Sequence, residues 1–296
     1  SFDFRKYKGK IIQYSNLMAL KKNVLNASKK NEVKKKLKLI TNKTSNIPWM
    51  KNANFLKMKK IKDLKRVTHL IYVHSFLETQ YMYGYDGFIS YEEWLEYSID
   101  HLIKRDNFII VKAHPSFFVR DLTNFNAYDL SIFNKIKDKY SSNKKIIFID
   151  YPLQNLHLLK KISKKTVIIS RHSTAIIEAV YLGFKIIASS ENFWDTKKLT
   201  LCNTWYDLKE YKKILFKSWS ELFYSKKNDL LSVSYDLFCR KSFSLGRDYF
   251  IKLISKNYNI PIDQVEFKIK YKLKNKKKLK KIQNQILKNS ISIEIF

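Results

Sequence analysis

Residues 166–188 read TVIISRHSTAIIEAVYLGFKIIA, and the fold can be worked out from this stretch. It begins with a run of β-branched residues, as in a buried strand, and residues 173–182 carry apolar side chains at helical spacing. Gly183 stands where a helix commonly ends with a residue in the left-handed conformation. Residues 184–188 form a second apolar run. A strand, a helix and a strand in this order predict a crossover unit with two parallel strands.

The same alternation extends towards the N-terminus. Further strands are predicted at 69–74, 108–112 and 145–149, with helices at 90–105, 130–140 and 155–162. Ser90 and Glu93 have the spacing of a capping box, which marks the start of the first of these helices. Short, almost uniformly apolar strands separated by helices indicate a parallel sheet covered on both faces. The predicted fold class is therefore α/β and Rossmann-like, with ligands bound beyond the carboxyl ends of the strands.

The chain has 296 residues and a net charge of +32, which is concentrated at its two ends. Residues 1–66 contribute +17 and residues 251–296 contribute +9, whereas residues 67–250 contribute only +6. Nearly all of the positive charge comes from Lys, while base recognition and phosphate forks favour Arg. We therefore expect an anionic membrane surface, and no nucleic acid, as the partner of the basic ends; a plain solvated surface is the alternative.

Several classes of protein are excluded by simple features. Cys202 and Cys239 are isolated, so the sequence supports neither a disulfide framework nor a structural zinc site. It contains no run of 18 or more apolar residues and nothing with the form of a signal peptide.

The remaining predictions are a strand at 11–14, helices at 17–39, 56–66 and 205–256, a strand-like alternation at 265–273 and a basic amphipathic stretch at 279–286.

A first polar motif follows the strand at 108–112 and reads Lys112-Ala-His114-Pro115-Ser116. Proline disfavours helical backbone at the residue before it, which holds the His114 imidazole at the end of the strand. An imidazole in that place can donate a hydrogen bond to a phosphate oxygen and stabilise the charge of a leaving phosphate. The alternative is a histidine that only closes a turn.

A second polar motif lies between the strand at 166–170 and the helix that follows. Ser173 and Thr174 stand where the first amides of the helix point outward, which is a suitable place for an anion. Glu178 is four residues after Thr174 and so on the same helical face, where it can accept hydrogen bonds from a ribose diol. Arg171 and His172 are further candidates for contact with the ligand. A simple N-cap at Ser173 and a solvent-facing or ion-paired Glu178 are the alternatives.

Together the two motifs resemble those of the bacterial capsule-polysaccharide biosynthesis glycosyltransferases, a GT-B-like group. That group has K-x-H-P-S at a strand end, followed by (G/S)-T-x-x-x-E-A-x-x-x-G at a strand–helix junction. The matching residues here are Lys112, His114, Pro115, Ser116, Ser173, Thr174, Glu178, Ala179 and Gly183. Residues 73–76 and 93–95 also look like the group, and the resemblance covers residues 68–195. His172 departs from it, because glycine is commoner at that position.

The resemblance implies a nucleotide-sugar donor and no cofactor or essential metal ion. In related bacterial sialyl- and Kdo-transferases the His-Pro histidine and a later Ser or Thr contact the donor phosphate. By this resemblance His114, Ser173 and Thr174 would bind phosphate, Glu178 would bind ribose, and Lys112, Pro115 and Ser116 would belong to the same site.

The catalytic base is not identified by either motif. Candidates within the chain are His74, Glu78 and Asp86, and for each of them a buried or loop-stabilising role is the alternative. Arg247 follows a turn glycine and is a candidate phosphate ligand; pairing with a neighbouring acid is the alternative there.

The sequence thus predicts a GT-B-like glycosyltransferase of capsule or lipopolysaccharide assembly. Residues 67–250 would be the donor domain, residues 1–66 a reduced or incomplete acceptor-side part, and residues 251–296 a helical, basic region in contact with the membrane. Its partners would be a CMP-keto sugar or a UDP- or GDP-sugar, and a lipid-linked or oligosaccharide acceptor at the cytoplasmic membrane face. A polyol-phosphate transferase of the teichoic-acid type and a non-catalytic basic module are the alternatives.

Overall fold

The structure is a computed structural model that describes residues 25–42, 61, 63–76, 86–118, 123–190 and 201–239. The segments predicted at 11–14, 265–273 and 279–286 lie outside these residues, as do Glu78 and Arg247. Of the helix predicted at 56–66, only the end is described, and it is a 3-10 turn, η3 (Leu64–Arg66).

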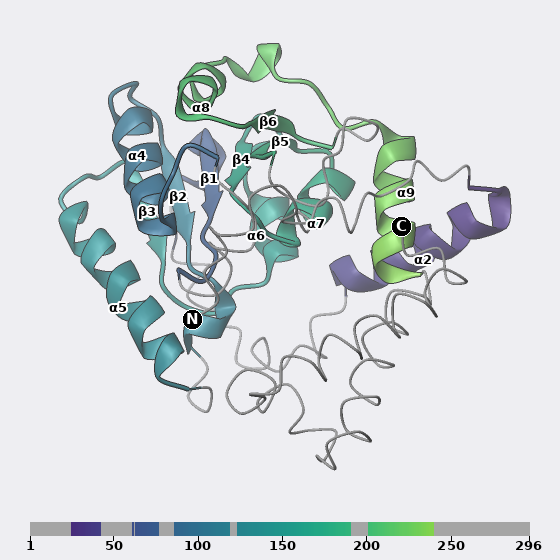
Figure 1. Cartoon of the computed structure of the whole chain (residues 1–296), viewed down its shortest axis with the longest axis horizontal. Helices are drawn as coiled ribbons and strands as arrows, with labels where there is room; N and C mark the ends of the chain where they lie inside the picture. The colour runs from purple at the N-terminus through teal and green to yellow at the C-terminus, as the bar shows by residue number, and fades with distance from the viewer. Residues whose placement is uncertain are drawn as a thin grey trace, which may run out of the picture.

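Six parallel strands form the centre of the molecule (Figure 1). They are β1 (His69–Tyr72), β2 (Ile109–Lys112), β3 (Ile146–Ile149), β4 (Val167–Ser170), β5 (Lys185–Ser189) and β6 (Asn203–Trp205). Their order in the sheet is β3-β2-β1-β4-β5-β6. The chain adds strands on one side of β1 and then returns to its other side with β4. This is the Rossmann order, and it puts the topological switch point between β1 and β4.

The five predicted strands and the Rossmann-like sheet are confirmed. The sixth strand was not predicted, because β6 is only three residues long and a helix was expected to begin at 205. Its sequence, Asn-Thr-Trp, has no apolar run that a pattern rule could recognise. Pairing with β5 creates this strand, with Ile187 opposite Asn203 and Ser189 opposite Trp205.

Helices cover both faces of the sheet. On one face lie α6 (Asn155–Lys161), α7 (Ala175–Tyr181), α2 (Ala27–Asn42) and α9 (Lys227–Phe238). On the other lie α4 (Tyr91–Ile103), α5 (Thr123–Lys139) and α8 (Leu208–Leu215). Short 3-10 turns, η4 (Pro115–Phe118) and η5 (Trp219–Glu221), complete the described elements.

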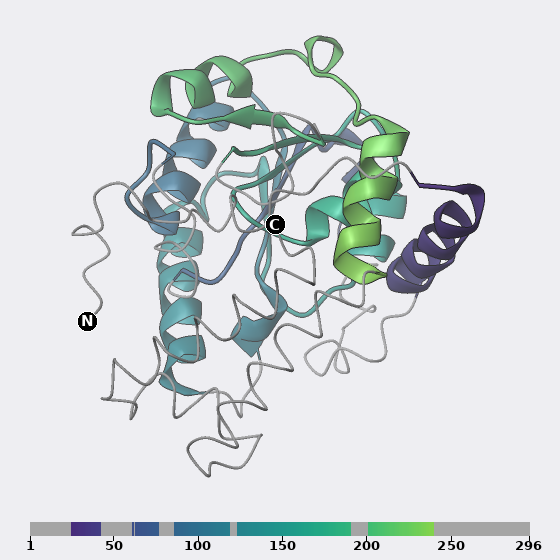
Figure 2. The same ribbon diagram turned by 45° about the vertical axis from the view of Figure 1, so that its right-hand side comes forward.

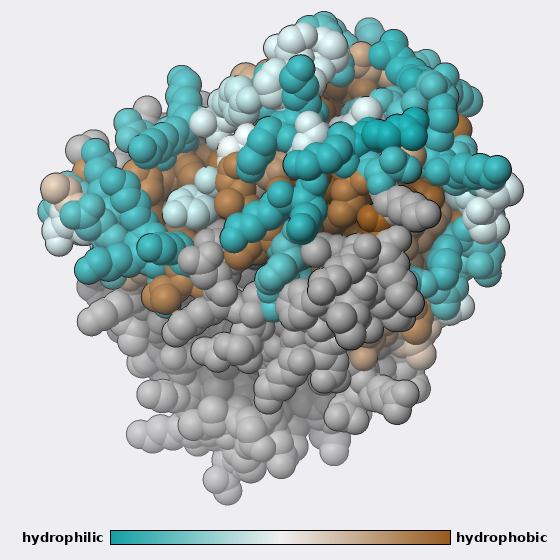
Figure 3. All heavy atoms as spheres, turned by 180° about the vertical axis from the view of Figure 1, so that it is seen from behind, coloured by the Kyte–Doolittle hydropathy of each residue, from teal (hydrophilic) through white to brown (hydrophobic). Residues whose placement is uncertain are grey.

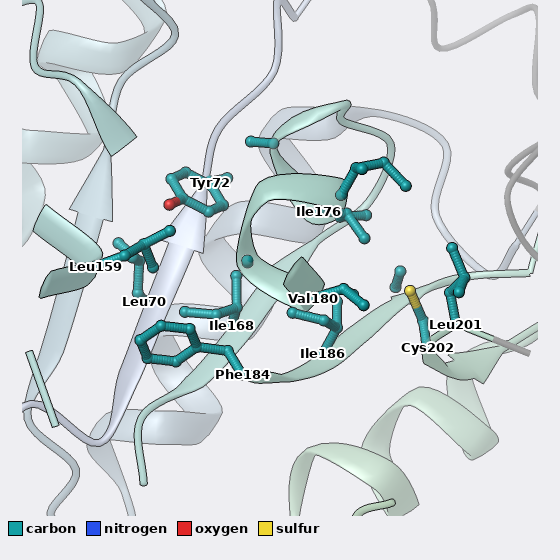
Figure 4. Packing of buried hydrophobic residues seen from close by; sticks show 14 of the residues in the cluster. Leu70, Tyr72, Leu159, Ile168, Ile176, Val180, Phe184, Ile186, Leu201 and Cys202 are labelled. Atoms are coloured by element: carbon teal, nitrogen blue, oxygen red, sulfur yellow. The ribbon is translucent and has the colours of Figure 1, made fainter. Parts of the chain in front are cut away.

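Alternate side chains of each strand serve the two faces, as the pleat requires. Leu70, Ile168 and Ile186 point towards α7, where they pack with Ile176 and Val180 (Figure 4). Their neighbours in sequence, such as Ile71 and Ile169, belong to the second cluster, under α4 and α8. Both faces are therefore apolar, which explains why the strands lack alternation in the sequence.

The described part of the N-terminal segment packs on the same core as the sheet. Val33 and Leu37 of α2 are buried in the cluster that contains α7 and α9. Figure 2 shows α2 and α9 side by side at the rim of the molecule. The division of the chain at residue 66 stays a prediction.

Two of the predicted helix boundaries show the local features expected of them, whereas α5, predicted at 130–140, already begins at Thr123. The Ser90 hydroxyl accepts a hydrogen bond from the Glu93 N–H at 3.0 Å, which begins α4 as the capping-box spacing predicts. The Glu93 carboxylate accepts from Ile89, one residue before the cap, at 2.8 Å. Gly183 has a φ of 80° just after α7, in the left-handed conformation expected there.

A space-filling view shows the hydropathy of one face of the described part of the chain (Figure 3). Seen from behind, hydrophilic side chains cover much of it, with smaller hydrophobic areas between them (Figure 3). No helix within the described ranges is both long enough and apolar enough to cross a membrane.

The backbone of Gly87 lies close to the start of α8. A Cβ atom there would lie 2.4 Å from the Leu208 nitrogen, and the residue has a φ of 101°. Gly183 also has a positive φ, but a Cβ atom there would meet nothing within 4 Å. The two glycines therefore form a matched pair, in which only one position adds a clash to the backbone strain.

We expect Gly183→Ala to lower the free energy of unfolding by about 1–2 kcal/mol, from strain at positive φ alone. Gly87→Ala should cost about 2–4 kcal/mol, because overpacking is added to that strain. Urea unfolding of both variants measures the difference. Equal losses of unfolding free energy in the two variants would show that the backbone at Gly87 can move away from the start of α8 without cost.

Candidate functional site

Three histidines stand side by side at the carboxyl edge of the sheet, because neighbouring strands pair in register. Tyr72 is opposite Lys112, and Ile71 is opposite Ile169, so β1, β2 and β4 end at one level. His74, His114 and His172 each come two residues after the last residue of their strand. The sheet thus places one imidazole on each side of the switch point and a third next to them.

Ring contacts connect these histidines. The rings of His74 and His114 have their centroids 5.2 Å apart. The ring of Tyr91, the first residue of α4, stacks on His74 at 5.8 Å. Its hydroxyl is 2.5 Å from Nδ1 of His172. One buried tyrosine therefore touches histidines from both sides of the switch point.

His114 is held by its own turn in a defined protonation state. Its Nδ1 accepts a hydrogen bond from the backbone N–H of Ser116 at 3.3 Å and lies 2.6 Å from the Ser116 hydroxyl. A backbone N–H can only donate, so Nδ1 is the acceptor, and the proton of the neutral ring lies on Nε2. The Pro115 turn therefore leaves Nε2–H as the donating end of this imidazole.

Burial keeps two of the three imidazoles neutral. The pKa of His114 is lowered to about 3, mainly because burial disfavours the charged ring and also because His74 and Lys112 lie near it. The pKa of His172 is well below its usual range, again mainly through burial and further through Arg171 and His74. At neutral pH both rings can therefore donate only as uncharged N–H groups.

Lys112 and Glu178 form a second polar group, on the α7 face of the sheet. Lys112 is the last residue of β2 and is buried, with its ammonium 5.8 Å from the centre of the Tyr72 ring. Burial lowers the pKa of Lys112 to about 8, and Glu178 opposes this shift. Burial also raises the pKa of Glu178 to about 6, against the effects of a hydrogen bond from Asn155 and of Lys112. The predicted ribose ligand is thus a half-buried carboxyl beside a buried lysine.

Asp86 was a candidate catalytic base and Arg171 a candidate ligand of the sugar donor, but the structure pairs the two side chains with each other. Both side chains are buried, and they form a two-point ion pair with distances of 2.8 and 2.7 Å. Arg171 also donates to the Phe88 carbonyl at 2.9 Å. This pairing favours the loop-stabilising alternative for Asp86, whereas Nη1 of Arg171 is buried without a hydrogen-bond partner among the described residues, and a donor-binding role for Arg171 stays a prediction.

Ser173 and Thr174 lie at the start of α7, as predicted. The Ser173 hydroxyl accepts a hydrogen bond from the Ala175 N–H at 3.2 Å, so it acts as a cap. Thr174 is exposed and its side chain makes no capping bond. A phosphate role for either residue stays a prediction.

The loop that carries His74 is anchored to α5. The Ser75 hydroxyl donates to Asp129 at 2.5 Å, and the Phe76 N–H donates to the same carboxylate at 2.9 Å. Sequence reasoning missed Asp129 and Tyr91, since each is a helix residue far along the chain from its partner. It also missed Asn155, although this residue follows a strand end, and that position was the available signal.

Three neighbouring histidines raise the question of a metal ion. Among the described residues, no group of three His, Cys, Asp or Glu side chains is arranged to hold one.

No protein-family model matches the chain, and no curated protein matches it. Among solved structures, the chain is similar to Thermosulfurimonas dismutans KpsC, a beta Kdo 2,4 transferase, with a TM-score of 0.45 and 13% identity over 74% of this chain and 59% of that one. It is also similar to Methanocaldococcus jannaschii UDP-GlcNAc 2-epimerase, solved with UDP-GlcNAc and UDP, with a TM-score of 0.39 and 16% identity over 73% and 54%. The chain thus spans less than two thirds of either protein. At these identities and TM-scores, function has to be argued from the residues of this chain.

The raised pKa of Glu178 predicts how stability changes with pH. The folded protein binds this proton more tightly than the unfolded chain, whose pKa is near 4.5. The resulting stabilisation is fully present below pH 4.5 and is lost as the pH rises through 6, and it amounts to about 2 kcal/mol. We expect the free energy of unfolding of the wild type, minus that of Glu178→Gln, to fall by this amount across that window.

Urea unfolding at several pH values measures this difference, and the histidine contributions cancel between the two proteins. A difference that rises with pH would show that the pair with Lys112 outweighs burial and keeps Glu178 ionised.

Proposed function

We propose that the chain contains the sugar-donor-binding unit of a metal-independent, GT-B-like glycosyltransferase of capsule or lipopolysaccharide assembly. This is the kind of enzyme that the two polar motifs resemble. The observation that carries the proposal is the neutral His114 ring, with Nδ1 occupied by Ser116, at the carboxyl edge of a Rossmann-ordered sheet.

That ring suits the chemistry of the leaving group. In the transfer step the acceptor hydroxyl oxygen forms a bond to the anomeric carbon, and the bond from that carbon to the donor phosphate oxygen breaks. Negative charge then grows on the phosphate. The Nε2–H of the neutral His114 ring would donate a hydrogen bond to that phosphate oxygen, and burial strengthens the interaction.

The proton of the acceptor hydroxyl needs a base. His74 is half-buried, and its ring lies 5.2 Å from that of His114, so it is the candidate base within the described site. The Asp86 carboxylate is held in a buried ion pair with Arg171, so we prefer His74 to Asp86 for this role.

The Lys112–Glu178 pair would lie under the nucleoside. A carboxylate that accepts hydrogen bonds from both ribose hydroxyls is favoured when a cation is near it, and Lys112 supplies that charge. The α7 face would therefore bind the nucleoside, and the histidine row would bind the phosphate.

The proposed membrane contact rests on the charge of the chain. Lysines at the two ends would hold the enzyme at the anionic inner face of the cytoplasmic membrane, where a lipid-linked or oligosaccharide acceptor is presented. Ser116, Ser173, Thr174 and Arg247 are proposed as further contacts of the phosphate.

We expect at least one of CMP, UDP, GDP or CDP to raise the melting temperature of the protein. A nucleotide at 100 times its Kd stabilises the fold by about 2.7 kcal/mol. If none of the four has an effect, the proposal fails. Stabilisation by a CDP-polyol, without any by CMP or UDP, would instead indicate a polyol-phosphate transferase.

His114→Ala should lower turnover of the stabilising sugar nucleotide by about 10²- to 10³-fold, the usual effect of removing one hydrogen-bond donor from such a site. His114→Gln should retain more activity, because its amide N–H can take the place of Nε2–H. His157→Ala, on the exposed side of α6, is the control and should match the wild type. Equal activity of His114→Ala and the control would contradict the assignment.

A further inference from the structure

Tyr91 is a buried residue that contacts two histidines of the row, His74 and His172, and the proposed function gives it no role. Its side chain is 1% exposed, and it begins α4, a helix that contributes no other residue to the site. Neither polar motif contains it. Its contacts nevertheless reach residues after both β1 and β4.

The hydroxyl of Tyr91 makes the first of these contacts. It lies 2.5 Å from Nδ1 of His172, and the two rings meet edge to face at 5.7 Å. His172 is itself buried. A phenol hydroxyl is a stronger acid than the N–H of a neutral imidazole, so we assign Tyr91 as the donor to Nδ1, which places the proton of the His172 ring on Nε2.

The ring of Tyr91 makes the second contact. It stacks on His74 with centroids 5.8 Å apart and an interplanar angle of 27°. His74 is half-buried, and its other neighbour in the row is His114, at 5.2 Å. The plane of the Tyr91 ring therefore limits how the His74 ring can turn.

The position of Tyr91 is in turn fixed from behind. The guanidinium of Arg171 lies over its ring at 4.9 Å, and Asp86 holds that guanidinium by two hydrogen bonds. The ring also meets Trp94 edge to face at 6.3 Å. A cation–π contact with Arg171, itself held by Asp86, and an aromatic pair with Trp94 thus stabilise the orientation of Tyr91.

We infer that Tyr91 is a positioning residue, which orients His74 through its ring and fixes the tautomer of His172 through its hydroxyl. It does not touch the substrate. The inference rests on the proposed function for its catalytic consequence, because His74 is the candidate base there. The buried ion pair of Asp86 and Arg171 then has a purpose as well, since it holds the residue that orients the site.

The test uses Tyr91→Phe, which keeps the ring and removes only the hydroxyl. Tyr97→Phe is the matched control, because Tyr97 lies on the same helix and stacks on a histidine outside the site, His101, at 3.8 Å. Histidine ring ¹⁵N spectra of the wild type should show His172 as the Nε2–H tautomer. Tyr91→Phe should change that signal, while Tyr97→Phe should leave it unchanged.

Kinetics supply the second measurement. Tyr91→Phe should lower kcat by between about 10- and 100-fold, because without the hydroxyl the His172 ring, part of the row that would bind the phosphate, is no longer held in one tautomer. The Kd of the nucleotide should change less than twofold. Tyr91→Leu, which also removes the ring stacked on His74, should lower kcat further. Tyr97→Phe should retain the wild-type kcat.

An unchanged His172 signal in Tyr91→Phe, or a kcat equal to that of the control, would overturn the inference. A loss of nucleotide affinity with unchanged kcat would overturn it too, since it would make Tyr91 part of the binding surface. If the wild type binds no nucleotide, the proposed function fails, whereas the tautomer measurement still decides whether Tyr91 controls His172.

Discussion

The site depends on one constraint, the in-register parallel pairing of β2, β1 and β4. Because Tyr72 is opposite Lys112 and Ile71 is opposite Ile169, residues at equal distances past the three strand ends become neighbours. His74, His114 and His172 meet for this reason alone, although they come from distant parts of the sequence. A shift of one residue in any of these pairings would send its histidine to the opposite face of the sheet. The apolar side chains packed on both faces make such a shift costly.

Much of the fold could be predicted from the sequence, because its signals are local. The β-branched runs, the Ser90–Glu93 spacing and Gly183 each depend on nearby residues only, and the structure has all three. The motifs also located two of the three histidines. β6 could not be found, since a three-residue strand exists only through its pairing with β5. The Asp86–Arg171 pair, the Asp129 anchor and Tyr91 depend on contacts between distant segments, which no spacing rule describes.

The site contains uncharged histidine rings beside acidic and basic side chains that lie next to each other in pairs. Burial makes a charged imidazole unfavourable at His114 and His172, and it brings the pKa values of Lys112 and Glu178 towards each other. The only fully buried ion pair among the described residues, Asp86–Arg171, lies behind this row, and both Asp86 oxygens accept from the Arg171 guanidinium. Such a pair is weak evidence for stability, but losing one partner is costly, so it fixes geometry. The charge of a bound phosphate would then be met by prearranged N–H donors.

The most direct test of this account is a crystal structure with the nucleotide that stabilises the protein. The account predicts the phosphate at the carboxyl ends of β1, β2 and β4, with an oxygen about 3 Å from Nε2 of His114. It also predicts the ribose on the α7 side, within reach of Glu178. A nucleotide bound at another edge of the sheet, or a His114 ring with Nε2 turned away from the phosphate, would contradict it.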